Sequence, residues 1–204
     1  MMSLINALPG AVAQGLIWGI MAIGVYLTFR ILDIADLTVD GSLGTGGAVC
    51  IMLMLSGQNV WVAMAGATAA GMAAGLATGI LHTFMGIPAI LAGILTQLGL
   101  YSINLKTMGK ANQAINVDKY DLLVSLRFIR KVPFYKNTIL IVALAIILLI
   151  VVLYWFFGTE LGCSLRATGC NDKMARAQGI NTDFNRVLGL MISNGLVALS
   201  GAML

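Results

Sequence analysis

The fold of this chain is decided by Thr138-Ile-Leu-Ile-Val-Ala-Leu-Ala-Ile-Ile-Leu-Leu-Ile-Val-Val-Leu-Tyr-Trp-Phe-Phe157. This stretch contains no charged residue, and a helix of about 20 apolar residues is long enough to cross about 30 Å of hydrocarbon. Its last four residues are aromatic, and Tyr and Trp are enriched at the interface between membrane and water. The stretch therefore predicts a membrane-spanning helix.

The rest of the chain repeats this pattern of long neutral stretches separated by short charged ones. Of its 204 residues, 59% are hydrophobic and only 10% are charged, whereas ordinary soluble domains carry about 25% charged residues. All the Asp, Glu, Lys and Arg residues fall within 30–40, 106–136 and 160–186. This distribution predicts an all-α, polytopic integral membrane protein built as a multi-helix bundle.

The predicted spans are 10–29, 43–56, 60–82, 88–105, 138–157 and 187–204, in one membrane domain covering residues 1–204. The second is short and rich in Gly, so we expect a short or broken helix there. The first is too long for the apolar core of a signal peptide and lacks a basic segment before it. The last stops without a polar flank, which we interpret as a chain truncated at its C-terminus.

Small and polar residues within these stretches suggest how the helices pack. Gly71, Gly75 and Gly79 recur at four-residue spacing, which favours close helix–helix contact in a bilayer. Four polar residues in or near the fourth span are candidates for a solute path, with hydrogen bonds between helices as the alternative role: Thr96, Gln97, Ser102 and Asn104. Three acids before the second span are interpreted as a solvated, helix-capping turn rather than a cation site: Asp33, Asp36 and Asp40.

Several classes of site are excluded by the sequence. It contains no phosphate-binding G-x-x-x-x-G-K-[ST] motif, no H-E-x-x-H and no G-x-S-x-G. The three Cys residues have no metal-ligand spacing, and the single His82 is expected to be structural. The basic pI near 9.1 reflects the loops, so we predict no nucleic-acid partner. We therefore expect no enzyme activity, bound cofactor or metal site on this chain.

The polar segment 158–186 contains a predicted short helix. Asn171 suits its N-cap, Asp172 suits the positive end of its dipole, and Gly179 suits its C-terminal stop. Ala175 and Gly179 are four residues apart, so we expect them on one face, with Lys173 and Arg176 beside them. This arrangement favours docking to a soluble partner, although an ordinary loop with one capped turn gives the same composition.

The pattern from Gly162 to Asn181, Gly-x3-Arg-Ala-x-Gly-x-Asn-x3-Ala-x3-Gly-Ile-Asn, resembles the coupling loop of ABC importer permeases of the branched-chain amino acid and ribose type. Residues 36–42, 87–96 and 188–202 resemble other parts of the same family, closest to its tryptophan/tyrosine-uptake subgroup. The resemblance implies ATPase-coupling roles for ten residues: Gly162, Arg166, Ala167, Gly169, Asn171, Asp172, Ala175, Gly179, Ile180 and Asn181.

The resemblance also implies the setting. We expect a bacterial-type cytoplasmic membrane, a separate ATPase subunit that holds ATP and Mg, a second permease copy and an extracytoplasmic substrate-binding protein. The solute would be small, with an amino acid as the first candidate, and alternating access would move it. An ion-coupled secondary transporter and a membrane protein without a transport role remain alternatives. The basic loop 106–136 is placed outside by the family topology, against the usual excess of positive charge inside.

Overall fold

The computed structural model describes residues 2–110 and 138–204, and within these ranges every regular element is a helix. The elements are α1 (Met2–Tyr26), η1 (Leu27–Ile31), α2 (Val39–Leu55), α3 (Val60–Thr83), α4 (Ala89–Met108), α5 (Thr138–Gly158), α6 (Glu160–Cys170), α7 (Asp172–Ala177) and α8 (Thr182–Met203). The all-α fold predicted from the sequence is confirmed. Most of the predicted loop 106–136 lies outside the described residues.

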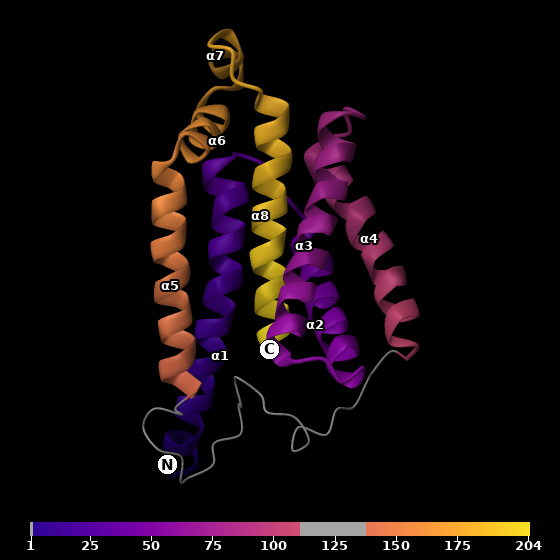
Figure 1. The fold of residues 1–204 in the computed structure, drawn as a ribbon, viewed down its shortest axis with the longest axis vertical. Helices are drawn as coiled ribbons and strands as arrows, with labels where there is room; N and C mark the ends of the chain where they lie inside the picture. Colours follow the sequence, from indigo (N-terminus) through magenta and orange to yellow (C-terminus); the bar gives the residue numbers. More distant parts are fainter. Residues whose placement is uncertain (1, 111–137) are drawn as a thin grey trace.

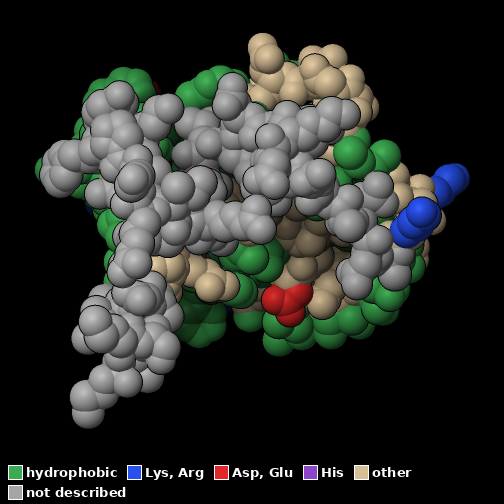
Figure 2. Space-filling view, turned by 90° about the horizontal axis from the view of Figure 1, so that it is seen from below, with side chains coloured by type: hydrophobic (Ala, Val, Ile, Leu, Met, Phe, Trp, Pro, Cys, Tyr) green, Lys and Arg blue, Asp and Glu red, His purple; other side chains and the backbone are tan. Residues whose placement is uncertain are grey.

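The long helices run alternately up and down along one axis (Figure 1). At one end lie α6 and α7, and α7 projects beyond the other helices. The N-terminus and the last described residue lie toward the opposite end. Seen from that opposite end, the described surface is hydrophobic or uncharged over most of its area, with basic side chains at one edge and an acidic side chain nearer the centre (Figure 2). Five described helices are long and apolar enough to cross a membrane, namely Gly10–Ile31, α3, α4, α5 and α8.

Helix α8 is the centre of the bundle and contacts α1, α2, α3 and α6. Glycine makes these approaches close: a Cβ on Gly75 of α3 would overlap the Leu190 carbonyl group, and one on Gly24 of α1 would come within 2.9 Å of the Ser193 oxygen. Close packing is the main source of helix association in lipid. The predicted packing role of Gly71, Gly75 and Gly79 is therefore confirmed, and their partner is α8.

Helix α5 stands at the edge of the bundle. It contacts α1 and α6. Only 6% of its apolar 18-residue stretch is buried, against 44% for the corresponding stretch of α8. Its outward side chains are Leu, Ile, Val and aromatic residues. Such a surface is stable only against hydrocarbon or another apolar helix.

The second predicted span is a short, continuous helix rather than a broken one. Helix α2 begins at Val39 and runs unbroken to Leu55, and the non-helical backbone lies before it, at residues 32–38. This segment follows the π-helical turn η1, where the Leu32 amide reaches back to the Leu27 carbonyl at 3.1 Å. Its residues Leu32, Ile34 and Thr38 are buried and its first half lines a polar pocket, and unwound backbone is tolerated in such places.

The segment 158–186 is more helical than predicted. We expected one short helix there, but the structure has α6, α7 and the first turns of α8, which begins at Thr182 rather than residue 187. The sequence did not predict α6 because its composition is polar, and a helix outside the hydrocarbon needs no apolar stretch. Its N-cap, Thr159, accepts a hydrogen bond from the Gly162 amide at 3.4 Å.

Candidate functional site

Helix α7 has well-formed caps at both ends. The Asn171 side chain accepts from the Met174 amide at 3.1 Å, as the sequence predicted. At the other end, the Gly179 amide donates to the Arg176 carbonyl and the Ile180 amide donates to the Ala175 carbonyl. This paired ending requires a left-handed residue, and Gly179 has φ of +83°. The six-residue helix is therefore set by its caps.

Charged side chains tie α7 to the beginning of α8. Arg176 Nε donates to Thr182 Oγ1 at 2.7 Å, and the Arg176 guanidinium also pairs with Asp183. Asp172 Oδ2 lies 3.2 Å from Arg186 Nη2 and 3.7 Å from Arg176 Nε. We call Asp172, Arg176, Thr182, Asp183 and Arg186 the α7 clamp.

The predicted docking face of α7 is wrong in its geometry. Ala175 is 3% exposed, because it faces the rest of the chain, and Gly179 lies beyond the helix end. The two residues therefore do not form an open flat spot. The exposed side chains of α7 are instead Lys173, Met174, Arg176 and Ala177, with Met174 60% exposed.

The remaining predicted coupling residues build the local structure. Gly162 packs against the Phe156–Phe157 backbone and Gly169 against the Ile31–Leu32 backbone, where a Cβ would clash. Arg166 donates to the Phe157 carbonyl at 2.7 Å and so satisfies the end of α5. The Ala167 carbonyl accepts from the Asn171 amide, and the Asn181 side chain caps α8 by accepting from the Phe184 amide at 3.1 Å.

The four predicted path residues on α4 separate into inward and outward groups. Thr96 is buried and accepts from Thr78 Oγ1 at 3.0 Å, and Thr78 lies 2.7 Å from Thr38 Oγ1. Thr96 therefore makes hydrogen bonds between helices, which was the alternative role. Gln97 and Asn104 lie against Gly41 and Gly44 of α2, whereas Ser102 is exposed and bonds to the Leu98 carbonyl of its own helix.

Sequence reasoning missed a polar contact near the middle of α8. Asn194 donates to Asp36 Oδ2 at 2.7 Å and accepts from Ser42 Oγ at 2.8 Å. Asp36 Oδ1 also accepts from the Thr38 amide. The interpretation of the three acids as a solvated turn holds for Asp33 and Asp40, which are exposed, but not for Asp36, which is half-buried with one carboxylate oxygen bonded to Asn194. The available signal was Asn194 within the mostly apolar stretch 187–199 of α8, since a polar side chain there needs a partner.

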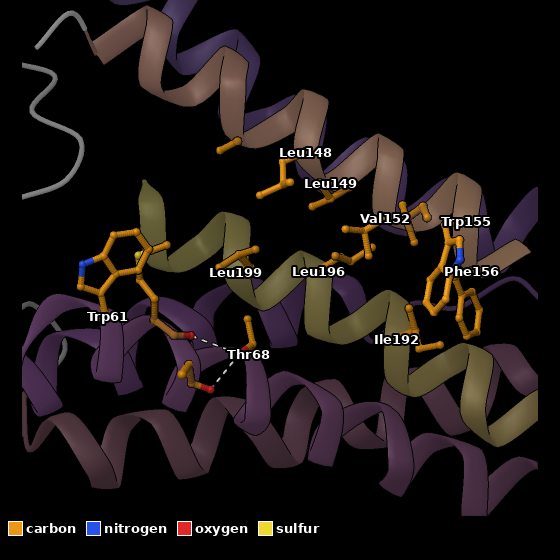
Figure 3. Close-up of a pocket in the computed structure, with 14 residues that line it drawn as sticks. Trp61, Thr68, Leu148, Leu149, Val152, Trp155, Phe156, Ile192, Leu196 and Leu199 are labelled. Carbon is orange, nitrogen blue, oxygen red and sulfur yellow. Dashed lines mark hydrogen bonds between the residues drawn. The ribbon is translucent and has the colours of Figure 1, made fainter. Parts of the chain in front are cut away.

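The two described pockets differ in chemistry. An apolar groove of about 630 Å³ lies between α3, α5 and α8 (Figure 3). Its one hydroxyl, on Thr68, turns back to the Met64 and Ala65 carbonyls. Beside this hydroxyl, the indole N–H groups of Trp61 and Trp155 are the other polar side-chain groups of the lining, and the remaining apolar surface suits hydrocarbon. None of the predicted path residues lines it.

A polar pocket of about 470 Å³ lies at the α6–α7 end. The α1–α2 segment, the α3–α4 connection, α6 and α8 all contribute to its walls. His82 closes one side and donates from Nδ1 to the Ile87 carbonyl at 2.8 Å, which agrees with a structural role. Among the described residues, no group of His, Cys, Asp and Glu is arranged to hold a metal.

Comparison with known proteins identifies the family. Residues 8–204 match the family model described as branched-chain amino acid transport system / permease component. The chain is 38% identical to a tyrosine transport system permease protein of Clostridioides difficile, over 98% of this chain and 64% of that protein. It is 35% identical to an uncharacterised protein of Rickettsia prowazekii, over 97% of this chain and 67% of that one.

A third relative is an autoinducer 2 import system permease protein of Yersinia pestis, 31% identical over 89% of this chain and 50% of the relative. The chain therefore spans about half to two thirds of the length of these relatives. No solved structure matches it. The family match covers nearly every described helix, and this multi-pass membrane protein belongs to the branched-chain amino acid transport system permease family.

Proposed function

We propose that this chain is part of the translocation subunit of an ATP-driven importer in a bacterial cytoplasmic membrane. The observation that carries the proposal is the family match over residues 8–204. A separate ATPase binds ATP and Mg, a second permease copy completes the pathway, and an extracytoplasmic binding protein delivers the solute. The named relatives transport tyrosine and autoinducer 2. We propose an amino acid, with tyrosine as the first solute to test.

In this proposal, the end that carries α6 and α7 faces the cytoplasm and docks on the ATPase. The projection of α7 beyond the bundle supports this role (Figure 1). So does the exposed Met174, because a large apolar side chain at the solvent-facing end of a membrane protein is suited to contact with a protein partner. ATP-driven closure of the ATPase pair then shifts the permease between outward and inward states.

The structure decides which variant tests docking. Gly179→Arg would force a side chain into a left-handed backbone, so a loss of ATPase capture could come from misfolding as well as from lost docking. Met174→Asp adds charge to an exposed position of α7 and leaves its caps in place. Gln58→Asp, in the exposed α2–α3 connection at the opposite end, is the matched control.

The experiment is a pull-down of the cognate ATPase with full-length permease, together with tyrosine uptake in proteoliposomes. We expect wild type and Gln58→Asp to capture the ATPase and Met174→Asp to lose most of that capture at equal membrane insertion. Capture by all three would move the docking contact away from Met174. Capture by none, with uptake driven by an ion gradient, would replace the importer with a secondary carrier.

A further inference from the structure

The beginning of α8 anchors the whole α6–α7 end of the molecule. Thr182, Asp183 and Arg186 hold α7 through the α7 clamp. Asn185, between them, holds α6: its Nδ2 donates to Thr168 Oγ1 at 2.9 Å, and its Oδ1 accepts from Ser164 at 3.3 Å. In the described structure, no side-chain hydrogen bond or ion pair joins α7 directly to α6. Helix α7 is therefore tied to α8 by side-chain hydrogen bonds and ion pairs, whereas it contacts α6 beside the chain junction without such bonds.

The backbone around α7 would bend without these contacts. Asn171 is extended, with φ of −157°, and separates α6 from α7. On the other side, Gly179 adopts a left-handed conformation in the short link to α8. Glycine moves between backbone conformations more freely than other residues. Without side-chain contacts, a six-residue helix joined to the chain at these two points would be free to change its orientation. The clamp removes this freedom on the α8 side.

We propose that the α7 clamp makes α7 and α8 one rigid body, and that Asp172 and Arg186 are positioning residues for coupling to the ATPase. This inference rests on the proposed function. A displacement of α7 then moves α8, which contacts α1, α2 and α3, rather than α5 at the edge of the bundle. The Asp172–Arg186 pair is the most sheltered ion pair of the clamp, with side chains 31% and 27% exposed, so salt screens it least.

A rigid-body test follows α7 directly. Spin labels are placed at Lys173→Cys on α7 and Leu199→Cys on α8, in full-length permease whose Cys50, Cys163 and Cys170 are Ser, bound to the ATPase in nanodiscs. The label-to-label distance is measured with and without ATP. Labels at Tyr101→Cys on α4 and Leu199→Cys form the control pair, which reports movement within the bundle.

We expect a narrow α7–α8 distance that ATP leaves unchanged, while the α4–α8 control distance shifts. Arg186→Gln should broaden the α7–α8 distribution, and Arg186→Lys, which keeps the charge, should restore it. An α7–α8 distance that shifts with ATP as much as the control pair overturns the inference. So does an Arg186→Gln distribution identical to that of wild type.

Transport provides the second readout, with tyrosine as the probe. Tyrosine moved per ATP hydrolysed should fall about tenfold in Arg186→Gln, a size typical of coupling between sites. ATPase capture should be unchanged, which a loss of folding would not allow. Asp172→Asn combined with Arg186→Gln should be no worse than the more damaging of the two single substitutions, because both remove the Asp172–Arg186 ion pair. Failure of wild type to capture the ATPase contradicts the proposed function instead. The width of the α7–α8 distance distribution in wild type and in Arg186→Gln, measured without the ATPase, then still decides the rigid body.

Discussion

The Asn194 side chain on α8 donates a 2.7 Å hydrogen bond to the Asp36 carboxylate in the non-helical segment ahead of α2. The same amide group accepts from Ser42 Oγ on α2 itself. One residue near the middle of α8 thus holds both the unwound segment and the first turn of α2. A displacement of α8 reaches α2 through this contact.

We therefore predict that Asn194→Leu destabilises the bundle. The substitution leaves a part-buried carboxylate oxygen of Asp36 without its donor, which costs about 1–3 kcal/mol. Thermal unfolding in detergent measures the effect. Ser200→Ala is the control on the same helix: it removes a single hydroxyl that donates to the Ile17 carbonyl at 2.8 Å, a loss of about 1 kcal/mol. An Asn194→Leu protein as stable as wild type would show that the contact does not hold the segment.

Gly75→Ala should weaken the contact between α3 and α8. A Cβ at this position would overlap the Leu190 carbonyl, which is backbone and has no rotamer to change. Overpacking of this kind costs about 1–3 kcal/mol. Gly99→Ala on α4, where nothing lies within 4 Å, should be neutral or slightly stabilising. Equal melting temperatures for the two variants would contradict the close approach of α3 to α8.

Thr78→Val should break a chain of three hydroxyl groups. Thr78 lies between Thr38 and Thr96, at 2.7 Å and 3.0 Å, so its loss leaves Thr38 without an acceptor and Thr96 without a donor. We expect a loss of about 1–3 kcal/mol because the site is buried. Thr107→Val, which removes an exposed hydroxyl bonded within α4, is the control. A lower melting temperature for Thr78→Val than for Thr107→Val is expected if the Thr78 hydroxyl holds helices together. Equal melting temperatures would contradict this role.

Gly179→Val should disturb the end of α7 more than Gly179→Asn. A β-branched residue at φ of +83° is strained, whereas Asn is found in left-handed conformations several times more often than most residues. The strain costs about 1–2 kcal/mol. Limited proteolysis near residue 179 measures the opening of the link, and faster cleavage of the Asn variant than of the Val variant would contradict the assignment.

Helix type and position could be predicted because they depend on local composition. The stretch 138–157 has no other stable form in a bilayer, since a helix satisfies all its own backbone hydrogen bonds. The caps of α7 followed from Asn171 and Gly179 for the same reason, because each acts within a few residues of its own position. The close approach of α3 was predicted by its glycine spacing, although its partner was not.

Tertiary structure alone decided which residues face one another. Ala175 was predicted to be an open docking residue and is 3% exposed, because its side of α7 faces the rest of the chain. Asp36 was predicted to be solvated and instead bonds to Asn194, far away in the sequence. Sequence by itself determined the apolar helices and the caps of α7, since those depend on neighbouring residues, but it missed α6 and the first turns of α8. Burial and pairing depend on contacts between distant residues, so only the packed bundle assigned Asp36, Asn194 and Ala175 their places.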